Sequence, residues 1–226
     1  MQRSIYYEAY FFWENSGLSS PKVVASLLIA AINGSPNHDG NTALLLRAAL
    51  SVAGELGAET RLINVAEVLA DLDQPFCENC STPCNASCAE GNKLGEAFEI
   101  LRRVDGLIIG SPVYFGTLTG QLAAFWDKTR TLRRDKALLN VVGGAVTVAQ
   151  ARFGGQETTL KAIHDLMLVQ GMIIVGDGHR DFDCGHQGAC AQRPSRDDTN
   201  AIDRTRILAR RIVEVAGATR DLRSEK

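Results

Sequence analysis

The sequence predicts an α/β protein built around a doubly wound parallel sheet. Apolar segments rich in Val, Ile and Leu alternate with helix-like segments along a chain of 226 residues. The apolar segments lack the strict alternation of half-exposed strands, which indicates strands covered on both faces. Repeated strand–helix units of this kind imply parallel strands joined by crossover helices. The length is sufficient for one such domain with a full core.

The predicted elements alternate in order along the chain. We expect strands at residues 23–33, 59–64, 106–111, 137–148 and 172–175. We expect helices at residues 42–56, 93–103, 120–130, 157–170 and 200–215. The main domain spans residues 23–216 and contains a cysteine-rich insert at 77–90. Residues 217–226 form a polar tail that we expect to fray.

The turn after the first strand has the composition of a phosphate cradle. Residues 33–42 read Asn-Gly-Ser-Pro-Asn-His-Asp-Gly-Asn-Thr. The first N–H groups of a helix have no intrahelical partner, and the helix dipole favours an anion there. The turn lacks the Gly-Lys-Ser/Thr of a P-loop and the G-x-G-x-x-G of a dinucleotide site, so a buried monophosphate is favoured. An ordinary turn capped by Asn41 or Thr42 is the alternative.

This turn and the chain length favour the flavodoxin-like strand order 2-1-3-4-5. Ligands of such sheets bind at the carboxyl ends of the strands, beside the point where the strand order reverses. We therefore expect three loops to lie together, at residues 34–42, 112–119 and 149–157.

The second of these loops is unusually apolar for a strand end. Pro112 stiffens it, and Gly116 permits a close backbone approach. Tyr114 and Phe115 could form a wall against an aromatic ring system. A hydrophobic plug over the end of the sheet is the alternative.

Motifs in all three loops point to one family. They are Gly34-Ser35-Pro36 with Gly40-Asn41-Thr42, then Ser111-Pro112-Val113-Tyr114-Phe115-Gly116 with Gly120-Gln121-Leu122 and Phe125-Trp126-Asp127, and finally Gly154-Gly155-Gln156-Glu157-Thr158. Together they resemble the NADPH-dependent FMN reductase and iron–sulfur flavoprotein superfamily. The resemblance covers roughly residues 23–215.

The resemblance implies an FMN site. It implies that the phosphate is held by Ser35, Asn37, Asn41 and Thr42. It implies that the isoalloxazine is lined by Pro112, Val113, Tyr114, Phe115 and Gly116. The segment 149–156 should close over the pyrimidine edge through residues that include Gln150, Arg152, Gly154, Gly155 and Gln156. The family often places Arg or Lys near position 37, where this chain has Asn37, so His38 or Arg152 is expected to supply the positive charge.

Four cysteines lie within one short segment, in the pattern C-x2-C-x3-C-x3-C formed by Cys77, Cys80, Cys84 and Cys88. Disulfides are disfavoured in a cytoplasmic chain. Structural zinc sites usually pair two short spacings across a longer gap, which this segment lacks. A compact run of four thiolates favours a [4Fe–4S] cluster, and zinc or reduced thiols are the alternatives. The run resembles the cysteine motif of iron–sulfur flavoproteins but differs in its later gaps.

A second group of Cys and His residues follows the fifth predicted strand. It comprises His179, Cys184, His186 and Cys190, whose spacings fit no recognised metal site. We expect a surface loop with free thiols. The resemblance places this loop near a neighbour's flavin or the substrate mouth, which makes His186 the one catalytic candidate outside the flavin itself.

Charge and hydropathy exclude other classes of function. The net charge of −2 with mixed signs gives no electrostatic footprint for nucleic acid. The longest apolar stretch, about ten residues, is too short to span a membrane. Residues 1–22 form an aromatic arm that Glu8 and Glu14 interrupt, so it is not a signal peptide. We expect a cytoplasmic protein whose arm packs on the body or on a neighbouring subunit.

These observations predict a flavin-dependent oxidoreductase. The favoured hypothesis is an iron–sulfur flavoprotein that passes electrons between a [4Fe–4S] cluster and FMN. The first alternative is an NAD(P)H-dependent FMN or quinone reductase whose cysteine segment binds zinc or nothing. The second is a non-catalytic electron carrier of the flavodoxin type. The expected partners are a small-molecule or protein electron donor and acceptor, and the resemblance implies a homodimer or homotetramer.

Overall fold

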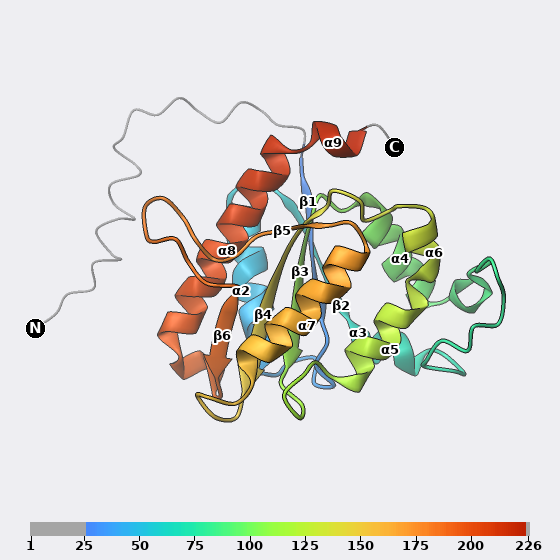
Figure 1. Cartoon of the computed structure of the whole chain (residues 1–226), viewed down its shortest axis with the longest axis horizontal. Coiled ribbons are helices and arrows are strands. Elements are labelled where there is room, and N and C mark those ends of the chain that lie inside the picture. The colour runs from blue at the N-terminus through green and yellow to red at the C-terminus, as the bar shows by residue number, and fades with distance from the viewer. Residues whose placement is uncertain (1–25, 225–226) are drawn as a thin grey trace, which may run out of the picture.

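A parallel sheet with helices on both faces forms the body of the computed structural model, which describes residues 26–224 (Figure 1). Its strands are β1 (Leu28–Asn33), β2 (Glu59–Asn64), β3 (Gly106–Pro112), β4 (Val142–Ala149), β5 (Ile173–Ile174) and β6 (Ala189–Gln192). The order is β2-β1-β3-β4-β5, with β6 also pairing with β4, and every pairing is parallel. The predicted doubly wound sheet and its 2-1-3-4-5 order are therefore confirmed. The predicted aromatic arm lies outside the described residues.

The helices form one layer on each face of the sheet. On one face, α2 (Asn41–Glu55) and α8 (Thr199–Ala218) pack side by side over a core that includes Leu45, Leu46, Leu208 and Ile212. The other face is covered by α3 (Val65–Ala70), α4 (Lys93–Arg103), α5 (Gly120–Lys128) and α7 (Gln156–Val169). All residues of β1 and β4 are buried, which accounts for their unbroken apolar sequence.

The fifth position in the sheet is divided between two short strands. The strand predicted at 172–175 is β5, which pairs with the start of β4 through Val142 and Ile173. The chain then leaves the sheet and returns as β6, which pairs with the end of β4 through Val146 and Ala189. The sequence did not indicate β6, because its four residues, Ala-Cys-Ala-Gln, lack the β-branched residues typical of a strand.

A buried carboxylate holds the segment between β5 and β6. Asp177 has no exposed surface and accepts a hydrogen bond from the backbone N–H of His186. Its carboxylate also lies 3.6 Å from the guanidinium of Arg204 on α8. Gly178 and Gly185 approach so closely that a Cβ on Gly185 would lie 2.2 Å from the Gly178 nitrogen. Residues 175–188 therefore form a fixed excursion, a loop that leaves the edge of the sheet and returns to it.

Three other boundaries differ from the prediction. Residues 137–141 precede β4 rather than forming its first half, and left-handed backbone at Lys136 and Asn140 breaks the extended conformation there. The helix predicted at 120–130 is two helices, α5 and α6 (Arg130–Arg134). The C-terminal tail does not fray within the described residues, because α9 (Asp221–Ser224) follows α8 and the nearly buried Arg223 pairs with Asp105.

A glycine in the middle of β3 sets the distance between the sheet and α2. A Cβ on Gly110 would lie 2.8 Å from Thr42 Cγ2 and 2.9 Å from Leu46 Cδ1. Contacts that short do not occur in relaxed structures, so α2 can lie this close only because position 110 has no side chain. The N-terminal turn of α2 is thereby fixed over the end of β3.

No helix within residues 26–224 combines the length and the apolar character that crossing a membrane requires.

The packing of α2 on Gly110 predicts the effect of adding one methyl group. Gly110→Ala should lower the free energy of unfolding by about 1–3 kcal/mol, because the methyl forces α2 away from the sheet. Gly54→Ala is the control on the same helix, where a Cβ would meet nothing within 4 Å. It should stabilise the protein by about 0.5–1 kcal/mol. Urea unfolding measures both, and equal effects of the two substitutions would contradict the packing described here.

Candidate functional site

The loops after β1 and β3 are joined by one buried hydroxyl. Thr119 Oγ1 donates a hydrogen bond of 2.6 Å to the carbonyl of Gly34 and accepts one from the N–H of Leu122. The N–H of Thr119 in turn donates to Ser111 Oγ. Because Thr119 has no exposed surface, these bonds are shielded from water. They bring the first two predicted loops together, as the strand order requires.

The loops after β3 and β4 also meet. Thr158 Oγ1 donates to the carbonyl of Gly116 over 2.7 Å. A Cβ on Gly155 would lie 3.0 Å from the Cα of Gly116. Both glycines have positive φ, at +78° for Gly116 and +91° for Gly155, so this approach depends on glycine at both positions. The three predicted loops therefore share one edge of the sheet.

The side chains of the first loop mainly hold the loop itself. Ser35 Oγ accepts the N–H of Asn37, and Asn37 Oδ1 accepts the N–H of Asp39. The helix α2 then begins after Gly40, which has no side chain to cap it. The first N–H groups of α2 are thus left for another acceptor, and Asn41 and Thr42 lie in that first turn.

A segment that the sequence did not connect to this site lies beside it. The N–H of Ser195 donates to Asn41 Oδ1 over 2.8 Å, and the N–H of Arg193 donates to the carbonyl of Ala149. Residues 193–195 therefore link the first and third loops. The contact between Ser195 and Asn41 joins residues 154 apart in the chain. The sequence could have indicated it only if β6, the strand that leads to Ser195, had been predicted.

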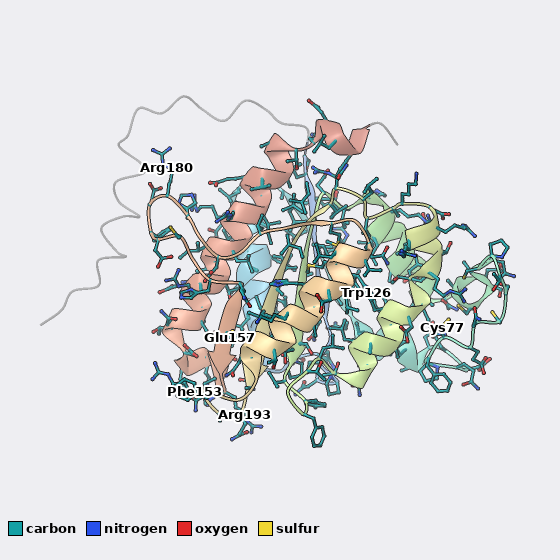
Figure 2. All side chains as sticks on the ribbon, in the orientation of Figure 1. Cys77, Trp126, Phe153, Glu157, Arg180 and Arg193 are labelled. Atoms are coloured by element: carbon teal, nitrogen blue, oxygen red, sulfur yellow. The ribbon has the colours of Figure 1, made fainter. Side chains whose placement is uncertain are left out.

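His38, the expected source of positive charge, lies next to an acid in the first loop. His38 Nε2 lies 3.4 Å from Asp39, and Arg47 pairs with the same carboxylate at 2.5 Å. The hydrogen bond from Arg47 lowers the pKa of Asp39 and keeps it ionised. Arg152 lies exposed in the third loop, and Arg193 lies at the same end of the molecule (Figure 2). Arg47 and Arg193 were not predicted.

Aromatic side chains stand exposed around the loops. The side chain of Phe115 is fully exposed, Phe153 nearly so, and Tyr114 about half. Phe115 also adopts a left-handed backbone with φ +52°, which is uncommon for a bulky residue. These residues do not plug the end of the sheet, so the alternative of a hydrophobic plug is wrong. Val113 and Pro112 are half-buried, and Gln150 is exposed at the end of β4.

The cysteine segment lies on a different side of the molecule, between α3 and α4 (Figures 1 and 2). All four thiols are free, and Cys80 and Cys88 are exposed. Arginines of α6 hold the segment: Arg134 donates to the carbonyl of Cys84, and Arg130 to Asn79 Oδ1. Arg130 Nη1 also lies 4.0 Å from Cys77 Sγ.

The four thiols lie within electrostatic reach of one another. Burial raises the pKa of the Cys88 thiol, Lys128 acts in the opposite direction, and the thiols of Cys84, Cys80 and Cys77 raise it further. Within residues 26–224, however, no three Cys, His, Asp or Glu side chains are grouped closely enough to hold a metal. The four thiols therefore lie on one segment but do not surround a common metal position.

The second Cys and His group does not form a site. Cys184 is exposed as expected, but Cys190 belongs to β6, is half-buried and accepts a hydrogen bond from Thr147 Oγ1 at 3.7 Å. Burial raises the pKa of its thiol. The expectation of a surface loop is thus wrong for Cys190. His186 pairs with Asp177 at 3.4 Å in the excursion between β5 and β6, and its described contacts include none with the three loops.

The strand order and the three loops at one sheet edge define a flavodoxin-like α/β protein. The model of the NADPH-dependent FMN reductase family matches residues 27–187. An iron–sulfur flavoprotein of Methanocaldococcus jannaschii is 38% identical over 190 residues, which cover 83% of this chain and 96% of that protein. An iron–sulfur flavoprotein of Methanosarcina thermophila is 35% identical over 189 residues, covering 83% and 94%.

A solved structure supports the fold. The flavodoxin, WrbA-like protein from Agrobacterium tumefaciens superimposes with a TM-score of 0.61 at 19% identity, over 85% of this chain and 98% of that one. The chain belongs to the NADPH-dependent FMN reductase family, and among its relatives are proteins named iron–sulfur flavoproteins. The predicted family is confirmed.

The buried hydroxyl at the loop junction gives a second prediction. Thr119→Val keeps the shape of the side chain but leaves the Gly34 carbonyl and the Leu122 N–H without their partner. The free energy of unfolding should fall by about 1–3 kcal/mol. Thr117→Val, in the same loop at an exposed position, is the matched control and should change stability by no more than about 0.5 kcal/mol. Urea unfolding measures the stability of both variants. If Thr119→Val were as stable as the control, the Thr119 hydroxyl would not hold the two loops together.

Proposed function

We propose that this chain is an FMN-dependent redox protein whose flavin lies across the three loops at the carboxyl edge of the sheet. The observation that most supports this is the start of α2, where a 15-residue helix presents uncapped N–H groups to a loop of small polar residues. Family membership makes FMN the ligand to test first. FMN, when bound, supplies one- and two-electron chemistry, and the protein contributes binding, orientation and electrostatics.

The phosphate would be held mainly by neutral donors. The N–H groups of the first turn of α2 and the amide of Asn41 are the proposed donors, and Thr42 adds a hydroxyl. Asn41 is fixed by the bond from Ser195 to its Oδ1, which directs the remaining NH2 group away from that contact. Arg152 and Arg193 are the exposed cations on the neighbouring segments. They would offset the phosphate charge, with His38 beside Asp39 as the further candidate in the first loop.

The second and third loops suit a flat apolar ring. Glycines at 116 and 155 bring backbone close to the ligand edge, and the Thr158 hydroxyl fixes their spacing. Exposed aromatic side chains at 114, 115 and 153 would lose water contact when a ring system or a neighbouring subunit covers them. Gln156 is nearly buried and bonds both to the Gly154 N–H and to the Ala151 carbonyl, so it shapes the third loop.

We also propose that the cysteine segment holds an iron–sulfur cluster of the [4Fe–4S] type. The donor set fits the group, because four thiols within twelve residues stand on one segment, with Glu78 as the one acidic residue and no histidine among them. Lys128, Arg130 and Arg134 face this segment and would partly offset the negative charge of four thiolates. An NAD(P)H-dependent reductase without a cluster is the alternative. The electron donor and acceptor would be small molecules or proteins.

The phosphate proposal predicts a charge effect on flavin binding. Asn41→Asp keeps the oxygen that accepts from Ser195 and replaces the donor with a negative oxygen, so the affinity for FMN should fall about tenfold or more. Stability should not fall, because an acid suits the first turn of a helix. Ser51→Asp adds the same charge further along α2 and is the matched control.

A comparison with riboflavin, which has the same ring as FMN, distinguishes an effect on phosphate binding from an effect on ring binding. Because riboflavin lacks the phosphate, its affinity for Asn41→Asp should equal its affinity for the unmodified protein. Flavin fluorescence titration measures all of these constants. Equal weakening of FMN and riboflavin, or unchanged FMN binding, would contradict a phosphate site at the start of α2.

The cluster proposal predicts the metal content of cysteine variants. Protein purified without oxygen should contain iron and acid-labile sulfide, and Cys80→Ser should lose both while keeping FMN. Cys184→Ser, which changes an exposed cysteine outside the cysteine segment, should keep both cofactors. Metal and sulfide analysis, with the visible spectrum, tests this. Absence of iron from the anaerobic protein, or its retention in Cys80→Ser, would rule the cluster out, and bleaching of the flavin by NADPH alone would then favour the reductase.

A further inference from the structure

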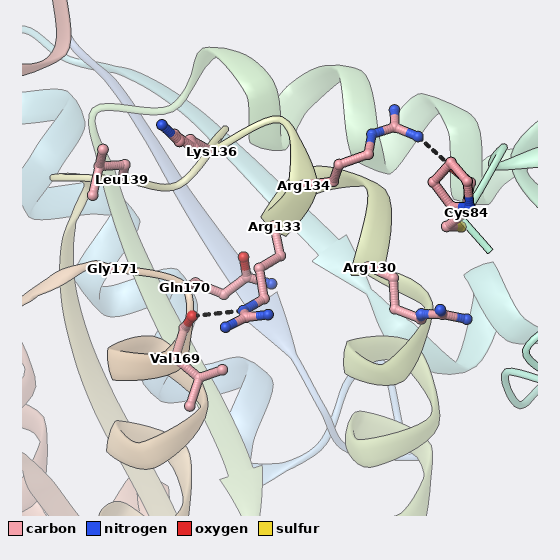
Figure 3. Close-up of a pocket in the computed structure, with 10 residues that line it drawn as sticks. Cys84, Arg130, Arg133, Arg134, Lys136, Leu139, Val169, Gln170 and Gly171 are labelled. Atoms are coloured by element: carbon pink, nitrogen blue, oxygen red, sulfur yellow. Dashed lines mark hydrogen bonds between the residues drawn. The ribbon is translucent and has the colours of Figure 1, made fainter.

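A cavity of about 640 Å³, shown in Figure 3, is lined by elements that Figure 1 places away from the three loops. It opens between α6, the turn that leads into β4, and the C-terminal end of α7, and Cys84 borders it. A second cavity of about 350 Å³ shares Arg130, Arg133 and Gln170 with it. A volume of this size is typical of small-molecule sites. Its lining residues precede β4 and β5, whereas the proposed flavin loops follow the strands.

The cavity is lined by cations and by no acid. Arg130, Arg133, Arg134 and Lys136 all contribute to its wall. Arg134 pairs with Asp135 at 2.7 Å, but within residues 26–224 no ion pair involves Arg130, Arg133 or Lys136. Arg133 instead donates through Nε to the carbonyl of Val169 over 3.0 Å, which leaves its terminal nitrogens available (Figure 3). An anion bound in the cavity would lower the mutual repulsion of these like charges.

A buried acceptor without a partner lies in the same wall. Gln170 is 7% exposed, and among the described residues its Oε1 has no hydrogen bond. The orientation of this amide is fixed, because the Thr129 hydroxyl donates to the Trp126 carbonyl and therefore accepts from Gln170 Nε2. Leaving such an oxygen unpaired costs about 1–3 kcal/mol, so the site lacks a donor.

The need to balance the charge of the cysteine thiols does not explain all of the polar and charged side chains that line the cavity. Arg130 and Arg134 do contact the cysteine segment. Arg133 contacts the end of α7 instead, and Gln170 belongs to that same end of the chain. The cavity therefore has recognition groups directed at something other than the thiols.

We propose that this cavity binds a small organic oxyanion, a phosphate ester or carboxylate that also carries a hydroxyl or amine donor. The oxyanion would lie between Arg130 and Arg133, where guanidinium groups can form paired hydrogen bonds. The donor would satisfy Gln170 Oε1 once that side chain shifts toward the cavity, because the oxygen has less than 1 Å² of accessible surface in the unliganded chain. The carbon part would contact the apolar sides of Leu139 and Val169. Arg130 also faces the cysteine segment, whereas Arg133 bonds to the end of α7 and Gln170 bonds to Thr129, so the proposed site is distinct from the proposed flavin and cluster sites.

The experiment is calorimetric titration of the full chain at constant ionic strength. The probes are glycerol 3-phosphate and citrate, which have both an oxyanion and a hydroxyl, and sulfate, which has no donor at neutral pH. Glycerol 3-phosphate or citrate should bind saturably at one site per chain and more tightly than sulfate. The response of the two probes identifies whether the phosphate ester or the carboxylate is preferred.

Substitutions in the protein test whether the probe binds in this cavity. Arg133→Ala, at an exposed position, should weaken the preferred probe about tenfold or more. Arg180→Ala, a change of similar size at a side chain 90% exposed elsewhere, is the matched control and should leave the constant unchanged. Gln170→Leu should remove the preference over sulfate. Asn41→Asp should bind the probe normally, which separates this site from the flavin phosphate site.

Three results would overturn the proposal. They are the absence of saturable binding by both organic probes, equal weakening in Arg133→Ala and Arg180→Ala, and loss of probe binding in Asn41→Asp. A preference over sulfate that persists in Gln170→Leu would refute the role of the Gln170 acceptor.

Discussion

The hydrogen bond between the Thr119 hydroxyl and the Gly34 carbonyl fixes the geometry on which the candidate site depends. It lies where the strand order reverses, with α2 leaving on one face of the sheet and α5 on the other. The same oxygen caps α5 through Leu122. Gly34 must lack a side chain there, since a Cβ would lie 2.9 Å from the Gly110 carbonyl oxygen. One buried hydroxyl and two glycines thus set both helices, and every loop around the site is held by a rigid element.

Different structural elements hold the proposed flavin site and the cysteine segment. The flavin loops extend from the ends of β1, β3 and β4, whereas the cysteine segment is attached to the body mainly by arginines of α6. Those arginines also border the cavity on their other side. The short helix α6 is therefore the element through which the cysteine segment and the cavity could influence one another, while the Thr119 junction is independent of it.

Local patterns made most of the sheet predictable, and distant contacts made the rest unpredictable. β1 and β3 are continuous apolar runs, and the turn at 34–42 is read from its own composition. The role of Ser195 at Asn41, in contrast, depends on β6, whose small residues join the sheet only because β4 offers a free edge. The pairing of Arg47 with Asp39 depends on one turn of α2 facing the loop, so the sequence did not indicate that Arg47 is a second cation beside His38. The FMN and cluster ligands remain predictions.

The divided fifth position of the sheet also affects how the protein behaves in a crowded solution. A continuous edge strand offers a row of unpaired N–H and C=O groups on which another chain can add a strand and begin to aggregate. Here β5 has two residues, β6 has four, and the excursion held by Asp177 separates them. A foreign strand would find no uninterrupted edge on that side. The opposite edge, β2, has charged side chains at Glu59 and Arg61, which oppose the same association. The chain can thus keep apolar, buried central strands without exposing a template for fibre growth.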